Sequence, residues 1–90
     1  MILNELRMQI DALNCQLVEL LGKRTEVARE IARIKKRDKL PILDPGRERT
    51  IKDEVRQLAR ANRISVAVVE EMFDLLLEYT RLEMEMEATE

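Results

Sequence analysis

The sequence contains no histidine, no tryptophan and one cysteine, Cys15, among its 90 residues. Without histidine the chain lacks the commonest metal ligand and the side chain that most often transfers protons near neutral pH. Because a single cysteine cannot form an intramolecular disulfide, a reducing, cytoplasmic location is the simpler expectation. These absences predict a protein without a metal site, in which acyl or phosphoryl transfer would be hard to assemble.

Turn-forming and aromatic residues are also scarce. There are two glycines, two prolines and 2% aromatic residues, against 46% apolar and 38% charged residues. That composition leaves little turn chemistry for a β-rich fold and suits long helices with charged outer faces. The net charge of −2 offers no basic field for nucleic acid. Apolar runs of about four residues are too short for a membrane span or a signal peptide. We therefore expect a single all-α domain over residues 1–90 that binds neither nucleic acid nor membranes.

The first forty residues carry the strongest pattern, in which apolar residues recur at alternating spacings of four and three. The series is Leu6, Ile10, Leu13, Leu17, Leu20, Arg24, Val27, Ile31 and Ile34. It predicts one helix over about residues 3–36, roughly 50 Å long at 1.5 Å per residue. A compact domain of this length has a radius of gyration of only about 12 Å, so the helix would extend beyond a monomeric fold. Its apolar stripe needs a cover, and the economical cover is a second copy of the chain.

Two prolines end this pattern. Pro41 and Pro45 push the residues before them out of the helical conformation. Asp44 followed by Pro45 is typical of an N-cap with proline at the first helical position. A second helix is predicted over about residues 45–61, and a third over about residues 65–86 with Ser65 as its N-cap. The expected fold class is all-α, with one long and two shorter helices in each chain.

Arg24 fits a plain helical bundle least well, because it occupies a position of the apolar series. A buried guanidinium costs several kcal/mol of stability unless an anion meets it. Arg24 could pair with a glutamate across a dimer or extend to solvent, or it could belong to a cationic pocket for an anionic ligand. Lys35 lies about 20° further around the helix and about 16 Å along it, so the two cations face the same way. Taken alone, Lys35 is an ordinary solvated lysine.

Five further residues have both an ordinary and a functional interpretation. Arg47 and Glu48 stand in the first turn of the second helix, where Glu48 could simply favour the positive helix end. Thr80 and Met84 lie on the core-facing stripe of the third helix and could be ordinary packing. Arg7 could be a surface arginine. It lies about 25 Å along the helix from the arginine of the apolar series, so it could reach the same small ligand only from a second chain.

The order and spacing of these residues form one longer pattern from about residue 6 to residue 80. It consists of Leu6-Arg7, Ile10-Asp11-x-Leu13, Leu20 to Arg24, Ile34-Lys35, Pro41-Ile42-x-Asp44-x-x-Arg47-Glu48, Phe73 and Glu78-Tyr79-Thr80. This pattern resembles that of the all-helical chorismate mutases, and Asp-x-x-Arg-Glu after a proline loop is its most specific piece. The family implies an intertwined homodimer with two active sites built from both subunits and no cofactor. The implied reaction is the rearrangement of chorismate to prephenate in aromatic amino acid biosynthesis.

The resemblance also implies roles for single residues. Arg7 of one chain and Arg24 of the other would bind the substrate carboxylates. Lys35 would bind a carboxylate and the ether oxygen of the breaking C–O bond. Glu48, with the backbone near Asp44, would bind the ring hydroxyl.

Three other positions match the family to different degrees. Arg47 would act electrostatically on the ring-hydroxyl site. Thr80 stands where the family usually has serine, and threonine preserves the hydroxyl group. Met84 stands where the family carries Gln or Glu as a second donor to the ether oxygen, and a thioether cannot donate a hydrogen bond. Glu83 or Glu87 could replace that donor, and the sequence does not decide between them.

Two alternatives remain open from the sequence. An isochorismate pyruvate-lyase on the same scaffold would also need cations around a dianionic enolpyruvyl ether. A non-catalytic helical dimerisation module would use Arg24 only for an ion pair. The mutase reaction nevertheless suits a chain without histidine, because it needs no nucleophile, proton transfer or metal. It needs the folded substrate conformer and cations near the developing negative charge.

Overall fold

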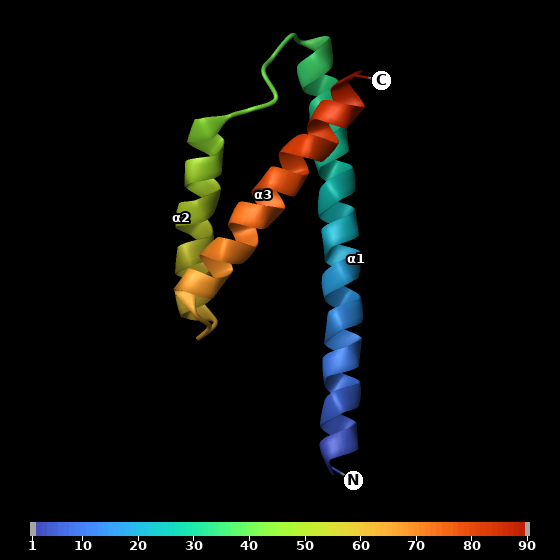
Figure 1. Ribbon diagram of the computed structural model, residues 1–90, viewed down its shortest axis with the longest axis vertical. Coiled ribbons are helices and arrows are strands. Elements are labelled where there is room, and N and C mark those ends of the chain that lie inside the picture. The colour runs from blue at the N-terminus through green and yellow to red at the C-terminus, as the bar shows by residue number, and fades with distance from the viewer. Residues whose placement is uncertain (1, 90) are drawn as a thin grey trace.

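The computed structural model describes residues 2–89, and these residues form three α-helices and no β-strand. Helix α1 spans Ile2–Arg37, α2 spans Pro45–Ala61 and α3 spans Val66–Thr89. Figure 1 shows α1 as one uninterrupted helix and α3 as a diagonal element that runs from α2 to α1. The predicted all-α class, with one long and two shorter helices, is therefore confirmed.

The start of α2 follows from its local sequence. Asp44 is the N-cap, and its Oδ1 accepts a hydrogen bond from Arg47 N at 3.0 Å. Pro45 occupies the first helical position, where its missing N–H is not needed and its fixed φ is already helical. The Asp44 cap and Pro45 thus fix the backbone conformation of the first turn of α2.

The connection from α2 to α3 is equally local. Arg63 adopts a left-handed φ of 58°, which reverses the chain after α2. Ser65 Oγ then accepts a hydrogen bond from Val68 N at 3.3 Å and starts α3. Helix α3 continues to Thr89, three residues beyond the expected end at residue 86. No glycine or proline follows residue 46, so nothing in the sequence stops the helix earlier.

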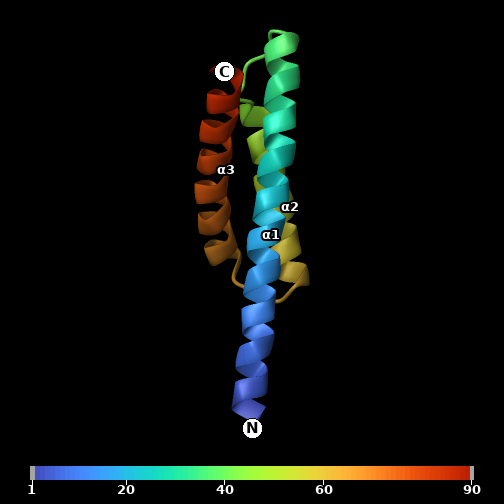
Figure 2. The same cartoon turned by 90° about the vertical axis from the view of Figure 1, so that its right-hand side faces the viewer.

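Helix α3 connects the fold, because it contacts both α1 and α2. The N-terminal half of α1 extends away from the other two helices (Figures 1 and 2). The molecule measures 56 Å by 26 Å by 15 Å, and its radius of gyration is 16.2 Å. A compact domain of this length has a radius of about 12 Å. A single chain is therefore an open arrangement of helices.

A face of small residues on α1 lets α3 approach closely. Thr25, Ala28 and Ala32 are the buried residues of α1, spaced three and four apart. Helix α3 adds the buried side chain of Met84 to the same cluster, and Ile42 from the loop packs against it. Because interaxial distance depends on the side chains at the contact, small residues here bring the two helices together.

The apolar stripe predicted on the first helix is a different face, and a single chain leaves it uncovered. Every residue from 2 to 23 is exposed. Leu6, Ile10, Leu13, Leu17 and Leu20 retain 51–61% of their accessible surface. This stripe lies roughly a quarter of a turn from the small-residue face. None of the three helices within residues 2–89 has the length and apolar character required to cross a membrane.

Candidate active site

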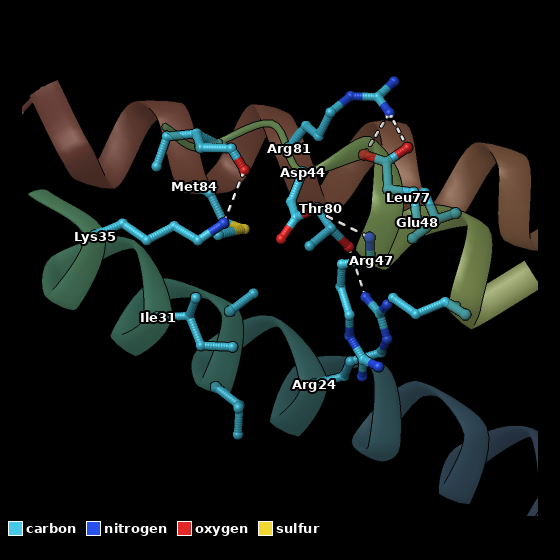
Figure 3. Close-up of a pocket in the computed structure, with 14 residues that line it drawn as sticks. Arg24, Ile31, Lys35, Asp44, Arg47, Glu48, Leu77, Thr80, Arg81 and Met84 are labelled. Atoms are coloured by element: carbon cyan, nitrogen blue, oxygen red, sulfur yellow. Dashed lines mark hydrogen bonds and ion pairs between the residues drawn. The ribbon is translucent and has the colours of Figure 1, made fainter. Parts of the chain in front are cut away.

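A cavity of about 390 Å³ lies where the C-terminal half of α1, the loop before α2 and the C-terminal half of α3 meet. Its wall includes seven of the eight predicted site residues: Arg24, Lys35, Asp44, Arg47, Glu48, Thr80 and Met84. Apolar side chains of Val27, Ile31, Ile42, Ile51 and Leu77 complete much of the wall. Figure 3 shows Arg24 and Lys35 on α1 opposite Thr80 and Met84 on α3.

Arg24 is half-buried and contacts α3 through a hydroxyl group. Its Nη1 donates to Thr80 Oγ1 at 2.6 Å, and that hydroxyl donates in turn to Leu76 O at 2.7 Å. Burial lowers the pKa of Arg24 below its ordinary value, and the nearby Arg47 guanidinium lowers the pKa further. Within residues 2–89 no carboxylate forms an ion pair with Arg24. The cation is therefore held at the cavity by a neutral partner.

Lys35 is fixed by the loop that follows α1. Lys39 has a left-handed φ of 58°, and Leu40 N donates to Lys35 O at 2.8 Å, so the chain folds back over the end of the helix. Lys35 Nζ then donates to Ile42 O at 3.1 Å. An ammonium group has three hydrogens to donate, so two remain for a ligand in the cavity. Lys35 is half-buried here, in contrast to an ordinary solvated lysine.

The first turn of α2 presents three charged residues to the cavity. Asp44, Arg47 and Glu48 are three and four residues apart, which places them on one side of the helix start. Besides the cap bond to Arg47 N, Glu48 N donates to Asp44 O at 3.0 Å. The N-cap therefore fixes the backbone from which these side chains project.

Arg81 is a cavity residue that the sequence analysis missed. Its Nη1 donates to both carboxylate oxygens of Glu48, at 2.7 and 2.9 Å (Figure 3). The hydrogen bond to Glu48 raises the pKa of Arg81 above its ordinary value. The available signal was composition: Arg81 is the one basic residue in the sequence of α3, which otherwise carries only acidic charges.

Met84 is 7% exposed and packs in the apolar cluster between α1 and α3. The two carboxylates that could replace its missing donor are engaged elsewhere. Glu83 pairs with Arg29 at 3.1 Å, and Glu87 pairs with Arg33 at 2.8 Å. Neither glutamate lines the cavity. These ion pairs join α3 to α1, so in this structure both carboxylates are directed to α1 arginines and away from the cavity wall.

Arg7 is the predicted site residue that the chain does not bring to the cavity. It lies on the exposed N-terminal half of α1. Seventeen residues of helix separate it from Arg24, which corresponds to about 25 Å. A contribution from Arg7 would require a second chain.

Positive charge exceeds negative charge on the cavity wall. The cations are Arg24, Lys35, Arg47 and Arg81, and the carboxylates are Asp44 and Glu48. Because Arg81 and Glu48 already neutralise each other, the remaining excess belongs to the other three cations. Such a wall favours a small ligand with two negative charges. Within residues 2–89 no three acidic or cysteine side chains gather closely enough to bind a metal ion.

Comparisons with known proteins identify a matching family and several relatives. Residues 6–85 match the family model described as chorismate mutase type II. The chain is 30% identical over 79 residues to the chorismate mutase of Methanocaldococcus jannaschii, covering 88% of this chain and 80% of that protein. It is 29% identical over 75 residues to the 4-amino-4-deoxychorismate mutase of Streptomyces venezuelae, covering 83% and 73%. A stretch of 56 residues, 62% of this chain and 16% of the relative, is 39% identical to a bifunctional chorismate mutase/prephenate dehydratase of Aquifex aeolicus.

Proposed function

This chain belongs to the type II chorismate mutase family, and we infer that it is a chorismate mutase, an isomerase that converts chorismate to prephenate in aromatic amino acid biosynthesis. In this reaction the ether C–O bond breaks while a C–C bond forms within one molecule, so every atom and electron stays in the product. One observation supports this function for the chain's own residues: Arg24, Lys35 and Arg47 line one cavity without a carboxylate partner in residues 2–89.

The cations act on the substrate in two ways. Arg24 binds one carboxylate through the donors that Thr80 leaves unused, and this helps to hold the folded, reactive conformer. Lys35 uses its two remaining hydrogens for a carboxylate and for the ether oxygen. That oxygen becomes negative as the C–O bond breaks, so its contact with Lys35 is stronger in the transition state than in the ground state.

The start of α2 binds the other end of the substrate. Glu48 accepts a hydrogen bond from the ring hydroxyl, together with the backbone near Asp44, and Arg47 adds positive potential beside Arg24. Thr80 serves as the neutral partner of Arg24. Met84 contributes an apolar wall and no hydrogen bond.

The active molecule in this proposal is a homodimer in which each site uses both chains. The uncovered stripe of α1 supports it, since burying a leucine or isoleucine side chain contributes about 1.5–3 kcal/mol and five such residues are half-exposed or more. A second apolar hollow of about 690 Å³ adjoins this stripe and is lined by Leu17, Leu20, Leu58, Phe73 and Leu76, among others. A second α1 lying across this hollow would cover both surfaces.

Symmetry then brings Arg7 to the site. If two α1 helices pair in antiparallel orientation about a two-fold axis near residues 15 and 16, position 7 of one helix lies opposite position 24 of the other. Arg24 lines both the polar cavity and the apolar hollow. Arg7 of the partner subunit would thus approach the Arg24 end of the cavity as a second carboxylate-binding cation.

The deciding experiment incubates the purified protein with chorismate and measures the formation of prephenate. Isochorismate is the comparison substrate, because a pyruvate-lyase on this scaffold would release pyruvate from it. A folded protein that binds and converts neither compound would be a dimerisation module, and the proposed function would be wrong. The proposal also places the enzyme in the cytoplasm, where the exposed thiol of Cys15 would stay reduced.

A further inference from the structure

The ion pair between Arg81 and Glu48 joins α3 to the first turn of α2 on the cavity wall. Both side chains are partly buried, with 35% and 25% of their surfaces exposed. One guanidinium nitrogen contacts both carboxylate oxygens, at 2.7 and 2.9 Å. Each oxygen therefore keeps a lone pair for a hydrogen bond from a ligand. Figure 3 shows the Glu48 carboxylate beside the guanidinium of Arg81.

We propose that Arg81 is a specificity-determining positioning residue, which neutralises Glu48 so that this end of the cavity selects a neutral hydroxyl donor over an ammonium group. The proposal rests on the chorismate mutase function proposed above, and it concerns the ring substituent that Glu48 contacts. Arg81 acts through Glu48 and needs no contact with the substrate.

This selectivity is electrostatic. A ligand nitrogen that donates to a Glu48 oxygen would lie about 2.8 Å from it, and hence within about 6 Å of Arg81 Nη1. A protonated amine at that position meets a like charge at close range in a partly desolvated site, which opposes its binding. A hydroxyl group carries no charge and donates to the same oxygen without this repulsion. The pair therefore keeps an acceptor on the wall while cancelling the charge that would attract a cation.

Other cations on the wall also repel a ligand ammonium group, but they do not neutralise the Glu48 carboxylate as Arg81 does. Arg24 and Arg47 lie beside the cavity and also repel a ligand ammonium. If Glu48 were not paired, its full negative charge would offset them locally. Arg81 is the residue whose removal changes the charge at the Glu48 carboxylate most directly, because it contacts both oxygens.

The test compares kcat/KM for chorismate and for 4-amino-4-deoxychorismate, whose primary amine is protonated at neutral pH. Arg81→Met removes the charge and keeps much of the side-chain volume. We expect its preference for chorismate over the amino compound to fall by about tenfold or more. The change should include a lower KM for the amino compound as well as a lower kcat for chorismate, because Glu48 loses its anchor. Arg81→Lys keeps the charge and should retain a preference close to that of the wild type.

Two controls separate this role from a general loss of structure. Arg33→Met removes an arginine whose ion pairs, with Glu87 and Glu26, lie away from the cavity, so the substrate preference should stay unchanged. The double variant Arg81→Met/Glu48→Gln has no carboxylate to attract the amine. It should therefore lose the improved relative kcat/KM for the amino compound that Arg81→Met shows. Circular dichroism checks that each variant folds, and Arg81→Gln serves as a second neutral variant.

The failures of the two proposals are distinguishable. If the wild type converts neither substrate, the proposed function is wrong and this inference fails with it. If the wild type converts chorismate but Arg81→Met and Arg81→Gln keep its preference, only the role of Arg81 is wrong. The same conclusion follows if Arg81→Lys shifts the preference as far as Arg81→Met does, or if neither neutral variant folds, because Arg81 would then be a structural residue.

Discussion

Arg24 Nη1 lies 2.6 Å from Thr80 Oγ1, so a guanidinium in the apolar series of α1 contacts a neutral hydroxyl on α3. The hydroxyl hydrogen is directed to Leu76 O, which leaves the oxygen lone pairs to accept from Arg24. This arrangement orients the arginine without cancelling its charge. A carboxylate in place of Thr80 would have neutralised the cation and weakened its attraction for an anionic ligand.

The first prediction concerns Arg24 itself. Arg24→Ala should reduce kcat/KM for chorismate by about 10²- to 10³-fold, the usual effect of removing one donor to developing charge. The fold should persist, because Arg24 makes one hydrogen bond to another helix and belongs to no apolar cluster. Steady-state kinetics and circular dichroism measure both effects. Full activity together with a raised melting temperature would mean that Arg24 is a costly structural charge and that the site is wrongly assigned.

A matched pair of substitutions tests whether the hydrogen bond from Arg24 to the Thr80 hydroxyl supports activity. Thr80→Ser keeps the hydroxyl and should retain most of the wild-type kcat/KM. Thr80→Val keeps the shape but removes the acceptor for Arg24, so we expect kcat/KM to fall by roughly tenfold. If the serine variant loses as much activity as the valine variant, the Thr80 methyl group matters and the hydrogen bond does not.

The exposed stripe of α1 leads to a prediction about assembly. The protein should have the mass of a dimer, about twice the 10.6 kDa of one chain, at micromolar concentration by light scattering. Leu13→Glu places a charge on the stripe and should cause dissociation with loss of helicity. Val18→Glu alters another exposed residue of the same segment, further around the helix, and should disturb assembly less. A stable, folded monomer of the wild type would contradict the proposed architecture.

Much of the fold was predictable because its signals are local. The spacing of apolar residues, the Asp44 cap and the two prolines define where helices begin and end, and these features act within a few residues along the chain. Seven of the predicted site residues line one cavity, since helical periodicity placed Arg24 and Lys35 on one side and the cap placed Glu48 beside Asp44.

The features that the sequence analysis missed depend on contacts between helices. Arg81 is 33 residues from Glu48, and only the packing of α3 beside α2 brings them together. Helix α3 also packs against α1, where Glu83 pairs with Arg29. Helical periodicity states which face a residue occupies but not which residue of another helix lies opposite, so such pairs require the three-dimensional structure.

Met84 gives a prediction with two measurable parts. Met84→Gln introduces a donor at the position where the family carries one, and we expect kcat to rise if that donor limits this enzyme. The amide would enter the cluster with Ala28 and Ala32, so stability should fall, by about 1–3 kcal/mol if part of the amide stays unpaired. Kinetics and chemical denaturation measure the two effects separately. Met84→Leu is the apolar control, which should change kcat little.

A lower kcat in Met84→Gln would have a definite interpretation. Glu83 and Glu87 pair with α1 arginines and do not line the cavity, so we expect neither to supply the donor in the wild type. A loss of activity would therefore mean that the apolar contact of Met84 shapes the cavity and that the enzyme works without a second donor to the ether oxygen.

The last prediction tests whether each site takes residues from two chains. Arg7→Ala and Lys35→Ala proteins should each be nearly inactive, because every site in either homodimer lacks one cation. When the two are unfolded, mixed equally and refolded, random pairing makes about half of the dimers mixed. In a mixed dimer one site takes Arg7 from the Lys35→Ala chain and Lys35 from the Arg7→Ala chain, and the other site lacks both. Activity should therefore recover to about a quarter of the wild-type value.

A parallel mixture of Arg24→Ala and Lys35→Ala provides the control, because its outcome should be the opposite. Arg24 and Lys35 line the same cavity of one chain, so each site of that mixed dimer still lacks one of them and activity should not recover. Arg7 and Lys35 cannot serve one site from one chain, since 28 residues of helix separate them by about 42 Å. Recovery in the first mixture alone thus requires a site shared between subunits. If heterodimers form in the first mixture and remain as inactive as their parents, Arg7 has no part in the site.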